Sequence, residues 1–430
     1  MLTLCWSVFL CPLYCLTHVL ELFDVCTYFI HIGGHVLHTL LQNSKRDGDR
    51  MTFIRRRIFI LIITVMVLLG LVPQKTSALS VSAKGAILIE QESGRILFEK
   101  NAHQRMRIAS ITKIMTAIIA IESGKLNEMV KVSNKAVRTE GSSLYLKPNE
   151  QVKLEDLVYG LMLRSGNDSA VAIAEHVGGS LEGFVFMMNQ KAAEIGMQNT
   201  EFANPHGLDD HENHFSSAYD MAILTRYAMM NEKYREIAGT KVHRAPNPTE
   251  KWDRVWRNKN KLLTKLYPYS TGGKTGYTKR AKRTLVSTAT KDGVALVAVT
   301  INASDDWNDH MNMFNRAFET YDLVKVIKEG DLQTDNSFYK GKVFVDHDFM
   351  YPLSEEEKKK IKLDISLLEP EKEWRKPEAV PDIVGTITVN LGDETIEEMP
   401  IYFDNGNVER SKETFWETLK SIFLVILGVR

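Results

Sequence analysis

Ser110 and Lys113 lie three residues apart in the stretch 109–113, which reads Ala-Ser-Ile-Thr-Lys. At the start of a helix, this spacing places both side chains on one face, about one turn apart. An alcohol beside an amine is a nucleophile beside a possible base, and the helix dipole there favours negative charge on a reacting oxygen. The pattern is weak by itself, because Ser337 and Lys340 repeat it in a polar stretch. An N-terminal helix serine beside a solvated lysine would look the same.

Two more motifs with hydroxyl, amide and amine groups follow, and each occurs once in the chain. They are Ser165-Gly166-Asn167 and Lys274-Thr275-Gly276. Three such motifs in this order are much less expected by chance than any one of them. If folding brings them together, a hydroxyl, two amines and an amide would surround one reacting group.

Helices are predicted to position the first two motifs. Apolar residues after Ser110 recur at i, i+3, i+4, i+7 and i+8 and continue round the helix, which predicts a buried helix that ends at Gly124. A second helical pattern over 154–164 stops before the Ser165 motif, and a third helix is predicted from 168 to about 177. The Ser165 motif is therefore a short loop held from both sides, a good position from which to present side chains.

The third motif is predicted to lie on a strand of an antiparallel sheet. Two strand-like runs, 284–290 and 294–301, follow it and are joined by Lys-Asp-Gly, which is a hairpin signal. An earlier hairpin is predicted from strands at 85–90 and 95–99. The glycines in 272–276 leave room for a ligand along the strand edge. Strands together with helices indicate an α+β fold.

Two polar segments are weighed as further sites. His206, His211, Glu212 and His214 could bind a metal, but their spacing fits no zinc helix motif, so we predict a polar surface loop and no metal. The basic cluster in 279–283 is interpreted as a solvated loop, with attraction of an anionic polymer as the alternative. No cofactor is predicted.

Composition narrows the class of protein. The 430 residues leave room for two or three domains, and 54 basic residues balance 54 acidic ones, so a nucleic-acid partner is not predicted. All four cysteines lie in the first 26 residues. Thiol chemistry, Cys-rich zinc sites and a disulfide framework are therefore excluded from the rest of the chain.

Residues 51–78 read as an export signal. A methionine and three arginines begin it, an apolar run covers 58–72, and small residues at 76–78 suit a signal peptidase. A transmembrane anchor is the alternative, although the run is shorter than the ~20 residues that span a bilayer. Residues 1–50 precede a complete signal, so we expect translation to begin at that methionine and the extension to have no part in function. An extra membrane segment near the N-terminus is the alternative.

After the signal, the chain is predicted to form one domain over 79–328, which carries the three motifs, and a β-rich domain over 329–411. Residues 412–430 place apolar residues on one helical face and charged residues off it. This pattern predicts an amphipathic helix that lies in a membrane surface. A helix packed on the β-rich domain is the alternative.

The three motifs together are the set found in penicillin-binding proteins and serine β-lactamases, with Ser-Gly-Asn in place of Ser-Asp-Asn. Within that set, residues 80–391 resemble the low-molecular-mass D-alanyl-D-alanine carboxypeptidases of peptidase family S11. Stretches such as 160–167, 204–209 and 272–278 look like the sporulation-associated DacB-type enzymes of endospore formers. The resemblance implies a penicillin-binding fold, an antiparallel sheet flanked by helices, followed by the β-rich domain and the C-terminal helix.

For this class, the residues suggest acyl transfer. Ser110 would attack the carbonyl between two D-alanines, and Lys113 would be the general base, which requires a neutral amine. Burial and a nearby Lys274 would both favour loss of its proton. Ser165 would pass protons to the leaving D-alanine, and Asn167 would hold Lys113 and the substrate backbone.

Substrate recognition is expected on the third motif. Lys274 and Thr275 offer a charge and a hydroxyl donor to the free terminal carboxylate, with Gly276 and Tyr277 also binding substrate. The resemblance implies an oxyanion hole made by the N–H groups of Ser110 and Tyr277. The implied partners are peptidoglycan stem peptides ending in D-Ala-D-Ala, β-lactams as covalent inhibitors, and a membrane surface. The implied location of the exported protein is the outer face of the cytoplasmic membrane or the cell wall, with peripheral attachment by the C-terminal helix, and the forespore membrane is the alternative.

Two other functions stay open. A class A serine β-lactamase would place Glu-x-x-Leu-Asn between the second and third motifs, and no Leu-Asn pair occurs there. Nitrocefin hydrolysis would test that function. A membrane-bound wall-binding or antibiotic-sensing module would bind a D-Ala-D-Ala peptide without releasing D-alanine.

Overall fold

The computed structural model describes residues 57, 59–61, 63–64, 79–247 and 250–405. The chain divides into two units, 1–77 and 78–430, and the six described residues of the first unit are helical. The predicted upstream extension, most of the export signal and the C-terminal amphipathic helix lie outside the described residues. In the described part, no single helix is long and apolar enough to cross a membrane. Helices α6 (Asn167–Gly178) and α7 (Leu181–Glu194) meet those criteria only together, as a pair bent by 84°.

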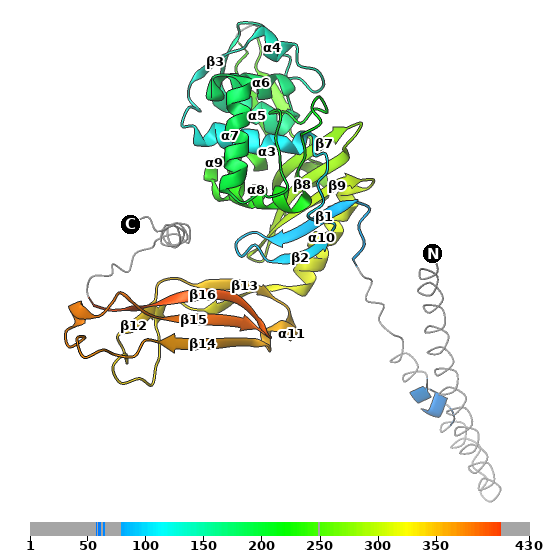
Figure 1. Cartoon of the computed structure of the whole chain (residues 1–430). Helices are drawn as coiled ribbons and strands as arrows, with labels where there is room; N and C mark the ends of the chain where they lie inside the picture. The colour runs from blue at the N-terminus through cyan, green and yellow to red at the C-terminus, as the bar shows by residue number, and fades with distance from the viewer. Residues whose placement is uncertain (1–56, 58, 62, 65–78, 248–249, 406–430) are drawn as a thin grey trace, which may run out of the picture. The chain divides into compact units, whose positions relative to one another are not determined.

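A five-stranded antiparallel sheet forms the centre of the part that carries the motifs (Figure 1). Its order is β2-β1-β9-β8-β7, so β7 is an edge strand. Both predicted hairpins are confirmed, because β1 pairs with β2 and β8 pairs with β9. Strand β1 also pairs with β9, which joins two distant stretches of chain. The strands are β1 (Gly85–Glu90), β2 (Ile96–Lys100), β7 (Ser270–Thr278), β8 (Lys282–Lys291) and β9 (Val294–Ala303).

Alternate side chains of this sheet face two different cores. Ile87 and Ile89 of β1 belong to one core, whereas Ala86 and Leu88 pack with residues of α10 (Asp306–Thr320). This alternation is the two-residue period of a strand that is covered on both faces. The first core is built from α6, α7 and four further helices, which are α3 (Lys113–Glu122), α5 (Leu154–Arg164), α8 (Ala218–Met230) and α9 (Glu232–Gly239).

The predicted buried helix after the first motif is confirmed. Every residue of α3 from Lys113 to Ile121 is buried, and Gly124 follows the helix in the left-handed conformation, at φ 73°. The predicted start of this helix is wrong, because Ala109–Thr112 form a separate 3-10 turn, η2. Ala109 lies in the left-handed region at φ 50°, which costs an alanine roughly 1–2 kcal/mol. The loop that contains Gly207 lies against the Ala109 carbonyl in this conformation.

The C-terminal part has a second sheet, of order β11-β12-β16-β15-β14, and a core of its own. A separate pair, β10 (Asp322–Ile327) with β13 (Phe349–Leu353), contributes Ile327 and Leu353 to that core. The predicted class, a helix-flanked antiparallel sheet followed by a β-rich region, is confirmed. The strands of the second sheet are β11 (Gly330–Asp331), β12 (Val343–Val345), β14 (Ile361–Leu367), β15 (Ile383–Leu391) and β16 (Glu394–Phe403).

Shorter elements complete the described chain. They are β3 (Met129–Lys131), α4 (Asn134–Val137), β4 (Gln151–Lys153), β5 (Val242–Ala245), β6 (Arg254–Arg257), η3 (Leu262–Leu266), α11 (Glu355–Lys358) and η4 (Pro377–Ala379).

Candidate active site

Ser110 lies in η2, where the backbone of two other segments comes very close. A Cβ on Gly276 of β7 would be only 2.9 Å from the Ser110 nitrogen and 3.2 Å from the Ile111 nitrogen. Gly207, at φ 84°, lies so close to the Ala109 carbonyl that a Cβ there would overlap the oxygen. Both approaches require a residue without a side chain. The third motif and the loop of Gly207 therefore enclose the backbone around Ser110.

Lys113 follows Ser110 by one turn and is fully buried, at 0% exposure. Its Nζ donates to Asn167 Oδ1 at 2.7 Å and to the His206 carbonyl at 2.6 Å, and Ser110 Oγ lies 3.1 Å away. A neutral amine has two N–H donors and one lone pair. Two oxygens that can only accept occupy the donors. The lone pair of the neutral amine therefore faces the Ser110 hydroxyl.

The surroundings of Lys113 favour this neutral form. Burial lowers the pKa of Lys113 well below the ordinary lysine value, and the positive charges of Lys274 and then Lys259 lower it further. The carboxylate of Asp168 opposes this shift to a smaller extent. Desolvation disfavours the ammonium form and like charges repel it, so both effects release the proton.

The second motif forms the break between α5 and α6. Ser165 ends α5 in the left-handed conformation, at φ 65°, and Asn167 begins α6. The Asn167 amide is fixed from both sides, because Oδ1 accepts from Lys113 and Nδ2 donates to the Glu140 carbonyl at 2.6 Å. Ser165 Oγ accepts from Lys274 Nζ at 3.0 Å. The motif thus connects the two lysines.

Lys274 lies on the edge strand β7 and is 1% exposed. Its Nζ donates to Ser165 Oγ and to the Thr275 carbonyl, the latter at 2.7 Å. Burial and then the charge of Lys259 lower the pKa of Lys274 to about 7. A carboxylate placed beside this amine would raise that pKa and retain the charge. Further along the strand, Tyr277 is 64% exposed, so this end of β7 is open to a ligand.

The fold brings the predicted residues of the three motifs together. Ser110 contacts Lys113, which contacts Asn167; Ser165 contacts Lys274; and the strand of Lys274 returns to Ser110 through Gly276. One hydroxyl therefore lies beside the buried Lys113 amine and a second lies beside the Lys274 amine, an arrangement with the groups that nucleophilic acyl transfer requires. Thr275 and Tyr277 lie on the same edge strand.

Two contributors were not predicted from the sequence. The His206 carbonyl holds Lys113, and a backbone acceptor leaves no trace in a side-chain motif. Lys259 lowers the pKa of both other lysines, and its Nζ donates to Ser142 Oγ at 3.3 Å. Burial and the charge of Arg164 lower the pKa of Lys259 in turn. An isolated lysine between two asparagines gives no recognisable signal in one sequence.

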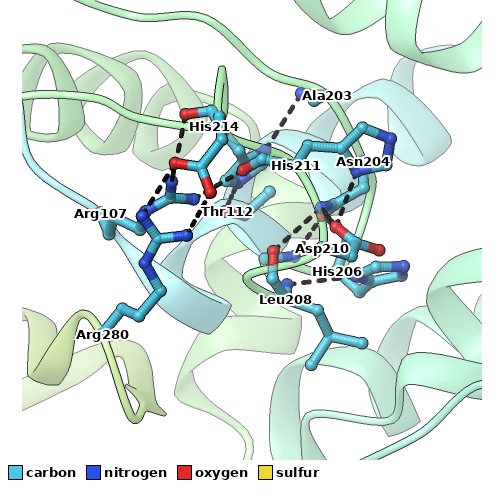
Figure 2. A network of polar contacts seen from close by, with 12 residues as sticks. Arg107, Thr112, Ala203, Asn204, His206, Leu208, Asp210, His211, His214 and Arg280 are labelled. Atoms are coloured by element: carbon cyan, nitrogen blue, oxygen red, sulfur yellow. Dashed lines mark hydrogen bonds and ion pairs between the residues drawn. The ribbon is translucent and has the colours of Figure 1, made fainter.

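The predicted polar surface loop is wrong for two of its histidines (Figure 2). His206 and His214 are only 5% and 2% exposed. Burial lowers the pKa of His206 to about 3 and that of His214 to about 4, so both rings are neutral. His211 is exposed and bonds to Asp210 through Nδ1. Within the described ranges, no group of three or more His, Cys, Asp or Glu residues could hold a metal ion.

The basic cluster is partly neutralised by carboxylates. Arg280 binds Glu212 through both terminal nitrogens, at 2.7 and 2.8 Å, and Arg107 binds the same carboxylate at 2.7 Å. Arg283 is paired with Asp306. Arg280 therefore links the segment after β7 to the loop of Glu212, although its side chain also faces solvent.

Residues 72–305 match a family model described as D-alanyl-D-alanine carboxypeptidase, and residues 321–409 match one described as the penicillin-binding protein 5 C-terminal domain. The chain is 33% identical to the D-alanyl-D-alanine carboxypeptidase DacF of Bacillus subtilis (strain 168), over 76% of this chain and 86% of the relative. It is 32% identical to DacC of Escherichia coli (strain K12), over 76% and 85%. The structure of penicillin binding protein 5 from Haemophilus influenzae is similar, with a TM-score of 0.65, 26% identity, and coverage of 76% of this chain and 98% of that chain.

Proposed function

Because the chain belongs to the serine-type D-alanyl-D-alanine carboxypeptidase family, we propose that it releases the terminal D-alanine of peptidoglycan stem pentapeptides through an acyl-enzyme on Ser110. The observation that carries this proposal is the position of Lys113. Its amine is buried, its two donors are occupied by oxygens, and its third direction faces Ser110 Oγ at 3.1 Å.

In the acylation step, neutral Lys113 removes the hydroxyl proton as Ser110 Oγ attacks the carbonyl between the two D-alanines. The oxyanion that forms accepts hydrogen bonds from the N–H groups of Ser110 and Tyr277. A donor of this kind is worth roughly 3 kcal/mol of barrier. Collapse of the intermediate breaks the amide bond, and the proton that Lys113 took from Ser110 passes through Ser165 to the leaving amine, which leaves Lys113 neutral again. Water then hydrolyses the ester and regenerates Ser110.

Lys274 and Thr275 bind the free carboxylate of the terminal D-alanine. This role is supported by the buried Lys274 amine, whose pKa of about 7 leaves it ready to take up a proton beside an anion. A charge-assisted hydrogen bond to a carboxylate is among the stronger polar interactions available to a protein. Asn167 keeps Lys113 oriented and offers its amide to the substrate backbone.

Mass spectrometry after penicillin treatment tests the proposal. Penicillin should add its mass once, on the peptide that contains Ser110, and Ser110→Ala should abolish both this adduct and D-alanine release from a pentapeptide. An adduct that survives Ser110→Ala would contradict the assignment. The same assay separates the two other functions: rapid loss of the adduct with nitrocefin turnover identifies a β-lactamase, and peptide binding without D-alanine release identifies a sensor.

Three finer assignments complete the proposal. Residues 51–78 direct export, residues 412–430 attach the enzyme to a membrane surface, and the substrate is peptidoglycan of the spore cortex. They are supported by the signal pattern, the amphipathic pattern and the resemblance to sporulation-associated enzymes. Muropeptide analysis of spores that lack the protein tests the last, because retained pentapeptides or altered cross-linking are expected there.

A further inference from the structure

We propose that His214 and Thr112 are positioning residues that aim the Ser110 N–H, one donor of the proposed oxyanion hole, by holding the carbonyl of the preceding peptide. The inference rests on the proposed function, because the N–H has a catalytic purpose only if an oxyanion forms beside Ser110. It gives a role to a buried histidine that the mechanism does not otherwise use.

A directed chain of hydrogen bonds runs through Ala203, His214 and Thr112, which are labelled in Figure 2, and ends at the Ala109 carbonyl. The Ala203 N–H donates to His214 Nδ1 at 3.0 Å, so this nitrogen is unprotonated and the hydrogen of the neutral ring is assigned to Nε2. Nε2 then donates to Thr112 Oγ1 at 2.9 Å, and that hydroxyl donates to the Ala109 carbonyl at 2.8 Å. Both side chains are buried, so water does not compete for these bonds.

The Ala109 carbonyl and the Ser110 N–H belong to one peptide group. Because that group is planar and trans, its C=O and N–H point in opposite directions. A hydrogen bond that fixes the carbonyl therefore fixes the direction of the N–H. Gly207 covers the carbonyl oxygen, and Gly276 leaves the space beside the Ser110 nitrogen free of a side chain.

The peptide needs this hold because of its conformation. Ala109 lies at φ 50°, a region that residues with a side chain rarely adopt. Strained backbone persists only where the surroundings over-determine it, and such strain is concentrated at functional sites. Removal of the Thr112 hydroxyl would take away the side-chain hydrogen bond that holds the carbonyl, and the N–H would turn away from the developing oxyanion.

The test uses the whole enzyme and three measurements: the rate of acylation by penicillin, kcat and KM for a D-Ala-D-Ala peptide, and the infrared band of the acyl-enzyme ester carbonyl. Thr112→Val removes the hydroxyl and keeps the shape. We expect the acylation rate and kcat to fall by about tenfold or more with little change in KM, because the lost interaction acts in the transition state. The carbonyl band should move to higher frequency as the ester loses polarisation, and Thr112→Ser should restore both readouts.

Two substitutions of His214 separate its two hydrogen bonds. His214→Gln can still donate toward Thr112, whereas His214→Asn can still accept from Ala203 but does not reach Thr112. We therefore expect the glutamine variant to keep more of the acylation rate, and a carbonyl band closer to that of the wild type, than the asparagine variant.

Thr116 supplies the matched control. It lies one turn further along α3, is equally buried, and donates to the Pro205 carbonyl of the same loop at 2.6 Å, not to Ala109. Thr116→Val should lower Tm about as much as Thr112→Val but leave the carbonyl band in place. Equal band shifts in the two variants, or an unshifted band and unchanged acylation rate in Thr112→Val, would overturn the proposal. Penicillin attachment that persists in Ser110→Ala would instead contradict the proposed function.

Discussion

Gly276→Ala should slow acylation of Ser110 by about 100-fold, or about 2.7 kcal/mol of barrier. The added Cβ would lie 2.9 Å from the Ser110 nitrogen and would overlap the Thr284 hydroxyl. That hydroxyl is not free to move aside, because it is buried and donates to the Ile108 carbonyl at 2.9 Å. Strand β7 and η2 must therefore separate by about 0.5 Å before the nitrogen contact reaches an ordinary 3.4 Å. The overlap with Thr284 requires a larger shift, and a displacement approaching 1 Å at reacting groups is enough for the stated loss.

The assay is the time course of labelling by a fluorescent penicillin, with thermal unfolding recorded on the same preparations. Gly272→Ala is the matched control, because its Cβ would meet Ala238 of α9 at 3.1 Å and would not approach η2. We expect this control to lower Tm with little change in the labelling rate. Labelling of Gly276→Ala at the wild-type rate, or equal slowing in Gly272→Ala, would refute the reasoning.

Three further predictions concern charge. Asn167→Asp places a carboxylate against Lys113 and raises the pKa of the lysine, so the acidic limb of the pH profile for penicillin acylation should move to higher pH. Asn167→Ala should slow acylation by about tenfold without that upward shift. Because the pKa of Lys274 is about 7, the lysine loses its positive charge as pH rises through 7, and kcat/KM for a D-Ala-D-Ala peptide should fall. This fall should be absent from Lys274→Arg, and initial rates measured across pH test both expectations. Stability should fall steeply in acid, because three buried neutral histidines have folded pKa values below the unfolded value of about 6.5, so the unfolded chain binds more protons as pH falls below 6.5. The slope should approach about 4 kcal/mol per pH unit between roughly pH 6 and pH 4 in urea unfolding, and a pH-independent free energy would contradict it. These histidines are His206, His214 and His310.

The convergence of the three motifs could be predicted because local sequence patterns mark the element that carries each of them. Ser165 and Gly166 separate two helical periodicities, and the strand of Lys274 precedes an Asp-Gly hairpin. The helix break and the hairpin are both visible in the local sequence. Packing of these elements into one core was then enough to bring the motifs together. The same reasoning gave the buried character of α3, because its apolar residues continue round the helix.

The conformation of Ala109 could not be predicted, because an alanine gives no sign of φ 50°. That angle accompanies tertiary contacts with Thr112 and Gly207, which act on the carbonyl from outside the local sequence. The burial of His214 was missed for a related reason. Its neighbours in sequence are polar, and its partner Thr112 is about a hundred residues away along the chain, so composition indicated a surface loop.

The pairing of β1 with β9 determines when the central sheet can be completed during synthesis. Residues Gly85–Glu90 are synthesised early, but the strand beside them, Leu296–Ile301, follows about 200 residues later. A nascent chain that ends before β9 would already contain Ser110, Lys113, Ser165, Lys259 and Lys274. Its central sheet would lack the strand that lies between β1 and β8. Activity should therefore appear only after β9 has paired with β1 and β8. Chains truncated before β9 should be inactive, whatever their length.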